Sequence, residues 1–394
     1  MGLALGPAVA LGLARFAYAL LLPAMRTDLG WSFATAGTMN TANAVGYLAG
    51  ALLAAPLGRR LGARAAFVAG LVVTAVALLG SAASGNLTLL LGLRVLAGLA
   101  GAVSFVVGAG LVAQAGAGRG PGRAALLLGV YFAGGGAGIV VTGLVIPALL
   151  AHTTVGAGWR AGWLLLGTLA VLAVAVSLPA VRSAEAPPTA RAGAGRWPAG
   201  SLVVLLGAYT LFGAGYISYM TFIVAFFKGE GAGDGEVSVF WVVLGVAAIA
   251  GGFAWSPLLG RLRGGRGPAV VLSVVAAGAL LPLLSASTVA TFGSAVLFGV
   301  AFLAVVTAVT GVARTSLHPR HWTPAIATLT VGFAAGQCAG PVLAGVLSDG
   351  PSGVRAGLAL SVGILAAGML LALLQPHREP VSDASASSSA EGSP

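Results

Sequence analysis

Charged side chains are scarce in this chain. Asp, Glu, Lys and Arg make up 7% of its 394 residues, whereas a typical soluble domain has roughly 25%. So few charges cannot provide a water-facing surface, which excludes a soluble globular fold. The hydrophobic share of 58% and the mean hydropathy of +1.01 indicate that lipid is the solvent.

The residues from which most catalytic and metal sites are built are also few. The one cysteine, Cys338, lies in an apolar segment, which excludes an intrachain disulfide and a cysteine metal cluster. The four histidines fall in predicted loops or the tail without metal-site spacing: His152, His318, His321 and His377. The sequence contains no convincing Ser/His/Asp set, phosphate-binding loop or paired carboxylate. We predict that the protein is not an enzyme and uses no catalytic residues, no metal and no cofactor.

Long apolar runs are abundant instead. A helix needs roughly 20 mostly apolar residues to cross the hydrocarbon core, and charges and Pro/Gly clusters divide the chain into twelve such runs. They are expected at about 3–25, 33–57, 65–84, 87–112, 124–150, 159–181, 200–227, 237–259, 268–286, 290–315, 324–347 and 354–375. We predict an all-α membrane protein with a six-helix bundle over 1–181, a cytoplasmic linker over 182–199, a second six-helix bundle over 200–375 and a disordered tail over 376–394.

Basic residues give the chain a net charge of +11. They are scattered through short loops and form no run or stripe, so nucleic-acid binding is not expected. With the amino terminus inside, fourteen of the twenty lie in inward loops or the tail, and four lie in outward loops. Since basic loops stay in the cytoplasm, both termini are predicted to be cytoplasmic, in the inner membrane of a cell.

The two halves of the chain repeat each other. Residues 57–64 (LGRRLGAR) and 259–266 (LGRLRGGR) match at five of eight positions, each directly after the second span of its half. At an offset of 201, Gly12 and Tyr18 correspond to Gly213 and Tyr219. Such a duplication gives two parallel repeats, which can rock about a site at mid-membrane and open it to each side in turn.

Three stretches resemble motifs of the major facilitator superfamily. Gly62 and Arg64 match the motif after that family's second helix, although Arg59 stands at its acidic position. Residues 94–98 (RVLAG) resemble its Arg-x-x-x-Gly motif, and residues 332–341 (GFAAGQCAGP) resemble its Gly-rich gating helix. The runs GLARFAYALLLP and YTLFGAGYISYMTF are similar to the YbfB/YjiJ-type branch. The resemblance implies two pseudo-symmetric bundles and a transport function, and it leaves the substrate open.

Arg15 is the sharpest single feature. It lies near the middle of the first predicted span, where a cation costs about 2.5–3.5 kcal/mol on insertion scales. The predicted spans hold no Asp or Glu away from their edges, so Arg15 has no counter-ion at that depth. We hypothesise that it binds an anionic group of the substrate, such as a carboxylate. The alternative is that it bonds helix-end carbonyls or polar side chains of neighbouring helices.

A polar lining is predicted around Arg15. Tyr18 is one turn away, on the same face of an α-helix. The other candidate substrate-binding residues are Asn40, Asn43, Tyr216, Tyr219 and Gln337, of which Tyr216 is the repeat-related counterpart of Arg15. The alternatives are helix-to-helix hydrogen bonding for the amides and packing for the tyrosines. Trp241 is predicted to anchor its helix at the membrane interface.

A second set of residues is predicted to control conformational change. Arg94 and Gly98 belong to one of the resembling motifs, and without a membrane acid we favour a structural or gating role for Arg94 over a proton relay. Glycines at four-residue spacing permit close helix approach: Gly134, Gly138, Gly332, Gly336 and Gly340, followed by Pro341. Arg59 is expected either to dock against a helix end or to serve membrane topology alone.

These features predict a secondary active transporter that moves a small organic solute by alternating access, with an anion as the first candidate. A proton is a candidate coupling ion, and a monomer is expected. Proton-coupled efflux of drugs or metabolites is the alternative, although the missing membrane carboxylate weighs against it. A membrane sensor without transport is the alternative from another class.

Overall fold

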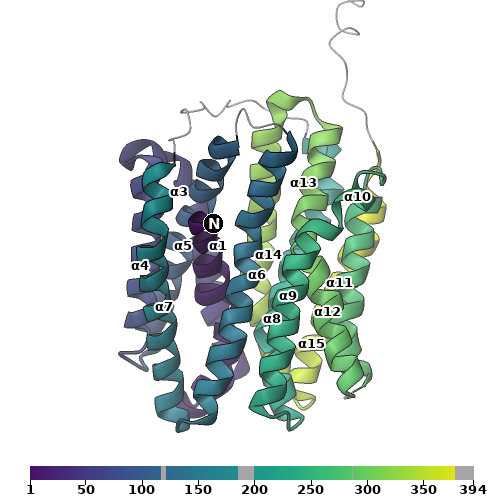
Figure 1. The fold of residues 1–394 in the computed structure, drawn as a ribbon. Coiled ribbons are helices and arrows are strands. Elements are labelled where there is room, and N and C mark those ends of the chain that lie inside the picture. Colours follow the sequence, from purple (N-terminus) through teal and green to yellow (C-terminus); the bar gives the residue numbers. More distant parts are fainter. Residues whose placement is uncertain (117–120, 185–198, 286, 378–394) are drawn as a thin grey trace, which may run out of the picture.

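The computed structural model describes residues 1–116, 121–184, 199–285 and 287–377 (Figure 1). The predicted linker, apart from its two ends, and most of the predicted tail lie outside the described residues. The division of the chain into two bundles at those boundaries therefore stays a prediction.

Twelve segments of the described chain are helical, long and apolar enough to span a membrane, which confirms the predicted count. The first span is composite and consists of η1 (Gly2–Ala4), α1 (Leu5–Pro7), the π-helix η2 (Ala8–Phe16) and α2 (Tyr18–Leu29). The others are α3 (Phe33–Leu61), α4 (Ala63–Gly80), α5 (Leu87–Gly116), α6 (Pro121–Ala151), α7 (Val155–Ser183), α8 (Val203–Gly229), α9 (Asp234–Ala254) with α10 (Ser256–Leu259), α11 (Arg266–Leu284), α12 (Thr288–Phe302) with α13 (Ala304–Ser316), η4 (Pro319–His321) with α14 (Trp322–Ser348), and α15 (Gly353–Leu373). A short turn, η3 (Ala199–Ser201), precedes α8.

Local sequence sets the turn between α2 and α3. Gly30 ends α2 in the left-handed conformation, at φ +63°, which a side chain would strain. Ser32 then caps α3, because its Oγ accepts a hydrogen bond from the N–H of Thr35 at 3.0 Å. The chain thus reverses within three residues.

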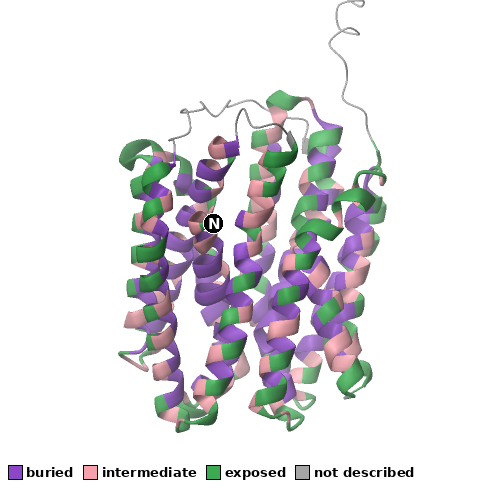
Figure 2. Cartoon of the chain, in the orientation of Figure 1, coloured by how far each residue is buried: buried purple, intermediate pink, exposed green. Residues whose placement is uncertain are grey.

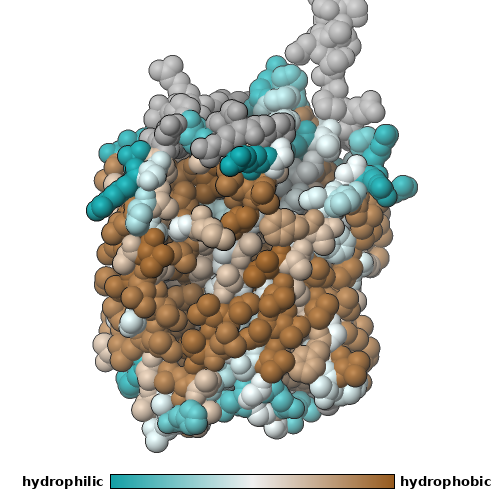
Figure 3. Space-filling model, viewed as in Figure 1, coloured by the Kyte–Doolittle hydropathy of each residue, from teal (hydrophilic) through white to brown (hydrophobic). Residues whose placement is uncertain are grey.

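The exterior of the bundle suits a lipid solvent. Hydrophobic side chains form a band around its middle, and hydrophilic ones gather at its two ends (Figure 3). Buried residues lie toward the centre, while exposed residues cover the outer faces and the ends (Figure 2). Exposed leucines and valines such as Leu172 and Val176 are therefore placed where acyl chains would cover them.

We call residues 1–184 the N-half and residues 199–377 the C-half. In Figure 1 the N-half, coloured purple to teal, lies on the left and the C-half, green to yellow, on the right. The halves meet mainly where α6 packs on α9 and α3 packs on α14. Any site shared by the halves must lie between these two helix pairs.

Close glycine contacts of the same kind recur in each half. In the N-half, Gly138 of α6 lies against Gly12 of η2, where an added Cβ would collide with backbone. In the C-half, Gly336 of α14 lies against the backbone of Thr210 in α8. Because small residues let backbones approach, the fifth span packs on the first in one half as the eleventh packs on the seventh in the other.

The halves are joined at one end of the bundle by direct polar contacts. We call this end, where Gly30 and Gly231 lie in turns, the Asp349 end. The carboxylate of Asp349, at the end of α14, accepts hydrogen bonds from the backbone N–H groups of Phe33 (2.7 Å) and Ala34 (2.9 Å) at the start of α3. This acid therefore caps a helix of the other half.

The same seam continues toward the middle of the membrane. Thr41 of α3 donates to the carbonyl of Cys338 in α14 at 2.7 Å. Between α6 and α9, Ser238 donates to the carbonyl of Gly143 at 2.7 Å. These contacts close the Asp349 end across both helix pairs.

Trp241 lies within this closed seam, so its predicted role as an interfacial anchor is wrong. The side chain is fully buried, and its Nε1–H donates to Thr142 of α6 at 3.3 Å. Its ring fills the space beside Gly143, which has no side chain. Tryptophan near a span end suggests a lipid interface, but a neighbouring helix covers this one.

A cavity separates the halves toward the opposite end, which we call the Arg64 end (top in Figure 1). This inter-half cavity has a volume of about 260 Å³. Its walls come from η2, α5 and α6 of the N-half and from α9, α10, α13 and the break between α12 and α13 in the C-half. Its lining includes Leu11, Phe105, Phe132, Trp255, Leu303 and Thr307. A larger cavity of about 350 Å³ at the Asp349 end is lined by the C-half alone and so does not lie between the halves.

Candidate functional site

Arg15 lies in a π-helical stretch of the first span. The N–H of Ala17 bonds to the carbonyl of Gly12, five residues back, at 3.0 Å. Such wide turns are rare and often occur at functional sites. The neighbouring contact of Gly12 with Gly138 brings α6 close on one side.

The guanidinium of Arg15 is buried but incompletely bonded. The side chain is 3% exposed, and its Nη2 has no hydrogen-bond partner among the described residues. Its Cζ lies 5.0 Å from the centre of the Tyr47 ring, a cation–π contact. The next residue, Phe16, has its ring centre 5.9 Å from that of Phe302 in the C-half. Arg15 therefore lies beside the interface between the halves.

A second incompletely bonded group lies on the other side of this interface. Gln337 of α14 is fully buried, and its Nε2 donates to the hydroxyl of Tyr216 at 2.6 Å. Its Oε1 has no hydrogen-bond partner in the described part of the chain. A cationic donor and an amide acceptor are thus both left free near Tyr216.

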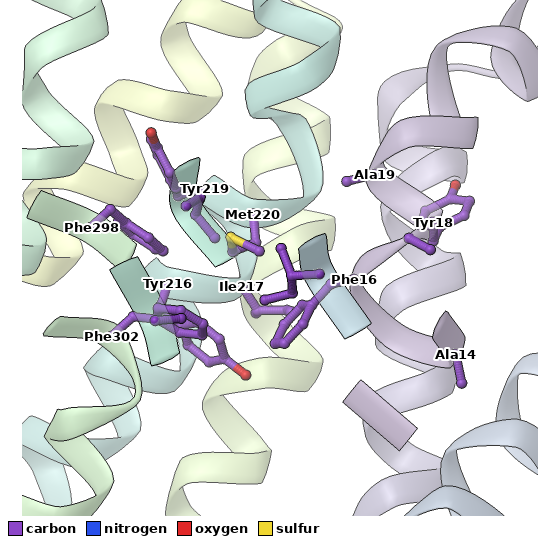
Figure 4. Packing of buried hydrophobic residues seen from close by; sticks show 14 of the residues in the cluster. Ala14, Phe16, Tyr18, Ala19, Tyr216, Ile217, Tyr219, Met220, Phe298 and Phe302 are labelled. Atoms are coloured by element: carbon purple, nitrogen blue, oxygen red, sulfur yellow. The ribbon is translucent and has the colours of Figure 1, made fainter. Parts of the chain in front are cut away.

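Aromatic rings surround Tyr216. Its ring lies nearly parallel to those of Phe212, Phe333 and Phe302, with centres 4.8, 5.7 and 6.2 Å away. Phe16, next to Arg15, meets Phe302 edge-on at 5.9 Å. Figure 4 shows Phe16 pointing across the interface toward Tyr216 and Phe302. The site therefore has an aromatic wall in the C-half.

Arg94 of α5 occupies a different environment, in which each guanidinium nitrogen has a hydrogen-bond partner. Its guanidinium donates to the carbonyl of Ala14, to the carbonyl of Met39 (3.4 Å) and to Oδ1 of Asn40 (3.2 Å). It also lies 5.3 Å from the ring centre of Tyr18 and 5.6 Å from that of Trp163. These partners form what we call the Arg94 socket.

Tyr18 belongs to this socket rather than to the surroundings of Tyr216. Its hydroxyl donates to the carbonyl of Ala36 at 2.8 Å, and its ring stacks on Trp163. Figure 4 shows it pointing away from Tyr216. The wide turn just before it changes the angular spacing from Arg15 that an ordinary α-helix would give.

Asn40 connects the socket to the C-half. While its Oδ1 accepts from Arg94, its Nδ2 donates to Thr221 of α8 at 2.6 Å. Asn43 instead donates to the backbone carbonyl of Arg94 at 3.3 Å, within the N-half. Of the two predicted asparagines, only Asn40 thus bonds across the interface.

Tyr219 lies apart from Arg15. Its hydroxyl shares a hydrogen bond of 2.5 Å with Ser294 of α12, and its ring stacks on Phe298 with centres 4.3 Å apart. Both partners lie inside the C-half. The structure thus brings Arg15, Tyr216 and Gln337 together and leaves Tyr219 outside that group.

Most of the predicted gating residues make contacts within one half. Gly134 and Gly138 pack on the first span, Gly98 packs on α3, and Gly332, Gly336 and Gly340 pack on α8. Pro341 is the exception, since its carbonyl lies against Gly37 of α3 across the interface. Arg59 is exposed in the last turn of α3. The glycines therefore shape each half.

Tyr47 shares a face of the second predicted span with Asn40 and Asn43, at i, i+3 and i+7, which predicts it as part of the polar lining around Arg15. Its place beneath the Arg15 guanidinium has no separate signal in the sequence. Sequence reasoning missed other residues of this region. Thr221 and Asp349 bond to partners more than 180 positions away, which no local pattern indicates. Among the described residues, His, Cys, Asp and Glu form no group that could hold a metal ion.

Comparison with known proteins places this arrangement in a family. Residues 7–373 match the family model described as "Uncharacterised MFS-type transporter YbfB". The chain is also 33% identical, over 285 residues, to the "Chloramphenicol resistance protein" of Streptomyces lividans, and the match covers 69% of this chain and 68% of the relative.

Solved structures of transporters share the fold. A bacterial homologue of the human lysosomal transporter Spinster, inward-facing and occupied, has a TM-score of 0.74 at 17% identity, with 95% of each chain covered. The nucleoside transporter NupG has a TM-score of 0.74 at 14% identity, over 95% of this chain and 98% of that one. A D-xylose–proton symporter has a TM-score of 0.74 at 13% identity, over 95% of each chain. At these identities the likeness shows the fold alone.

Proposed function

The chain belongs to the major facilitator superfamily, in its YbfB-type branch, and we propose that it carries a small organic anion across the membrane. The observation that supports an anion is the unpartnered Nη2 of the buried Arg15. The one ion pair among the described residues joins Lys228 and Asp234, at the Asp349 end. A ligand carboxylate would supply the acceptors that the protein does not offer Arg15.

Alternating access accounts for the asymmetry of the interface between the halves. The halves are hydrogen-bonded at the Asp349 end and separated by a cavity toward the Arg64 end. The excess of basic residues in the loops at the Arg64 end supports a cytoplasmic location for that end, and in that orientation this conformation is open inward. Transport then requires the contacts of Asp349 and Thr41 to break while the inter-half cavity closes.

Arg15 is well placed to sense which conformation the protein adopts. It belongs to the N-half, while Tyr216 and Gln337 belong to the C-half. An anion held between them would contact both halves at once. Since a ligand shifts an equilibrium only through its differential contacts with the two states, such a bridge can couple binding to rocking.

Drug export is a second candidate, supported by the name of the Streptomyces lividans relative. The inter-half cavity is lined largely by apolar side chains, which suits the aromatic ring of a neutral drug. Neutral cargo would not need Arg15. Expression of the protein in a chloramphenicol-sensitive strain, as wild type and as Arg15→Ala, separates the two functions: Arg15-independent resistance supports drug export.

A binding screen tests the anion proposal. Purified full-length protein is heated in detergent with small organic anions, matched neutral amides or hydrophobic cations, as wild type, Arg15→Ala and Arg15→Lys. We expect anions alone to stabilise the wild type, with the shift lost in Arg15→Ala. Arg123→Ala is the control, because Arg123 is an exposed arginine near the Arg64 end. Anion stabilisation that persists in Arg15→Ala contradicts the proposal.

A further inference from the structure

The inter-half cavity lies beside the Arg15 site, although Arg15 itself does not line it. Leu11 is one of its walls and lies four residues before Arg15 in the same π-helix. Phe105, another wall, has its ring centre 6.3 Å from that of Tyr47, which lies under the Arg15 guanidinium. Tyr47 therefore contacts both the cavity wall and the buried cation.

Residues of the C-half also connect the inter-half cavity with the Arg15 site. Leu303 lines the cavity at the break between α12 and α13, and it follows Phe302, whose ring stacks on Tyr216. One side of the combined region is thus cationic and hydrogen-bonding, through Arg15 and Gln337. The other side is the apolar cavity. A ligand that satisfies both must be amphipathic.

The size and composition of the cavity limit the apolar part of such a ligand. Its volume of about 260 Å³ falls below the roughly 300–1,000 Å³ typical of pockets for drug-sized molecules. Three of its walls are aromatic: Phe105, Phe132 and Trp255. Flat rings pack well on such side chains, so a single ring with short substituents fits better than a long chain.

We propose that the substrate is an aromatic monocarboxylate, with its ring in the inter-half cavity and its carboxylate extended past Tyr47 to Arg15. This assignment rests on the proposed function and adds the substrate class to it. The acid supplies acceptors for the free Nη2 of Arg15. The ring replaces water or lipid in contact with the cavity walls. Tyr47 then lies beside the junction of ring and carboxylate.

Binding of matched probes to the full-length protein in nanodiscs tests the assignment. The probes are benzoate, acetate (the same charge without a ring), cyclohexanecarboxylate (the same charge with a ring that is not flat), benzamide (the same ring without the charge) and chloramphenicol. We expect benzoate to bind at least about tenfold more tightly than acetate, since ring burial adds apolar contact. Cyclohexanecarboxylate should bind more weakly than benzoate, and benzamide and chloramphenicol more weakly still.

Two matched variants locate the ring. Phe132 is 43% exposed, so Phe132→Ala should fold, and we expect the benzoate-to-acetate ratio to fall about fivefold. Phe292→Ala makes the same change at the Asp349 end, where Phe292 lines the cavity of about 350 Å³ that belongs to the C-half alone. It should leave the benzoate-to-acetate ratio unchanged. Arg15→Ala should weaken benzoate and acetate alike.

The possible failures can be told apart. Equal, Arg15-dependent binding of benzoate and acetate overturns the aromatic assignment and leaves the anion function standing, as does a benzoate preference that Phe132→Ala does not change. Equal binding of cyclohexanecarboxylate and benzoate also overturns it. If benzamide or chloramphenicol binds as tightly as benzoate and without Arg15, both the assignment and the anion function fail.

Discussion

The two buried arginines of the N-half differ in what surrounds them. Arg94 is held by two backbone carbonyls, by Asn40 and by two aromatic faces. Arg15, on the first span, has the ring of Tyr47 beneath its guanidinium and an Nη2 without a hydrogen-bond partner. Both carry the cost of a cation in the membrane interior, of about 2.5–3.5 kcal/mol on insertion scales. In the Arg94 socket the protein offsets that cost with its own acceptors, whereas it offers no acceptor to the Nη2 of Arg15.

The two arginines are of the same residue type and both are buried. They differ in how many hydrogen-bond acceptors the protein supplies to the guanidinium. An arginine with all its acceptors supplied by the protein holds helices together. An arginine without them remains able to bind a ligand. In this chain, the first kind joins the first span, α3 and α5 within the N-half, and the second faces the C-half.

The largest effect is expected from the socket. Arg94→Met should lower the free energy of unfolding by about 3 kcal/mol or more, because it leaves Asn40 Oδ1 and two buried carbonyls without their donor. Thermal melting in detergent measures the loss. Arg94→Lys should recover only part of it, since an ammonium cannot reproduce the planar fork. If Arg94→Met melts like the wild type, Arg94 does not stabilise the fold and the contrast with Arg15 is wrong.

Arg15→Met is the matching substitution at the other site. We expect stability to change by less than about 1 kcal/mol, because no protein hydrogen bond to Nη2 is lost. Benzoate affinity should nevertheless fall by about tenfold or more, as expected for the loss of a charge-assisted contact. Melting and ligand titration on one preparation check both parts. Loss of stability equal to that of Arg94→Met would show that Arg15 is structural as well.

The tyrosines beside each arginine offer a milder test. Tyr18→Phe removes the hydrogen bond to the carbonyl of Ala36 and should cost about 0.5–1.5 kcal/mol. Tyr47→Phe keeps the ring beneath Arg15 and should change the free energy of unfolding very little. Chemical denaturation of the two variants side by side gives the difference. Equal losses would indicate that the Tyr47 hydroxyl has a structural partner.

The smallest effect is expected where the socket contacts the C-half. Thr221→Val removes the acceptor of Asn40 and should cost about 0.6 kcal/mol, the average for hydrogen bonds between membrane helices. Thr168→Val is the control, because the exposed Thr168 hydroxyl bonds only to the carbonyl of Leu164 in its own helix. A loss no larger than in the control would show that this bond does not hold the halves together.

Much of the fold could be predicted because the lipid solvent imposes it. Each predicted span corresponds to a helical segment, with ends displaced by a few residues; α4, for example, begins at Ala63 rather than at 65. Apolar run length determines such segments directly. The burial of Arg15 could also be predicted from its position near the middle of a span. Its lack of a counter-ion could be predicted because the spans hold no acid at that depth.

The partners of the two arginines could not be predicted. Arg94 bonds to the carbonyls of Ala14 and Met39, and backbone acceptors have no signature in the amino-acid sequence. The expectation that Tyr18 shares a face with Arg15 assumed α-helical spacing, which the π-helix at Ala8–Phe16 does not keep. The contact of Gln337 with Tyr216 depends on how α14 packs on α8. Whether a segment forms a helix is determined by the residues within it, but the site depends on contacts between spans that are distant in sequence.

The hydrogen bonds from α3 to Asp349 offer a way to measure the opening of the Asp349 end. The amide protons of Phe33 and Ala34 are held by a carboxylate of the other half. When the halves part at that end, these two amides lose their acceptors while the rest of the helix keeps its own ladder. Hydrogen–deuterium exchange at these positions therefore reports how often that end opens, without any introduced label. The opening that we propose for the transport cycle can thus be followed through two backbone protons of the unmodified protein.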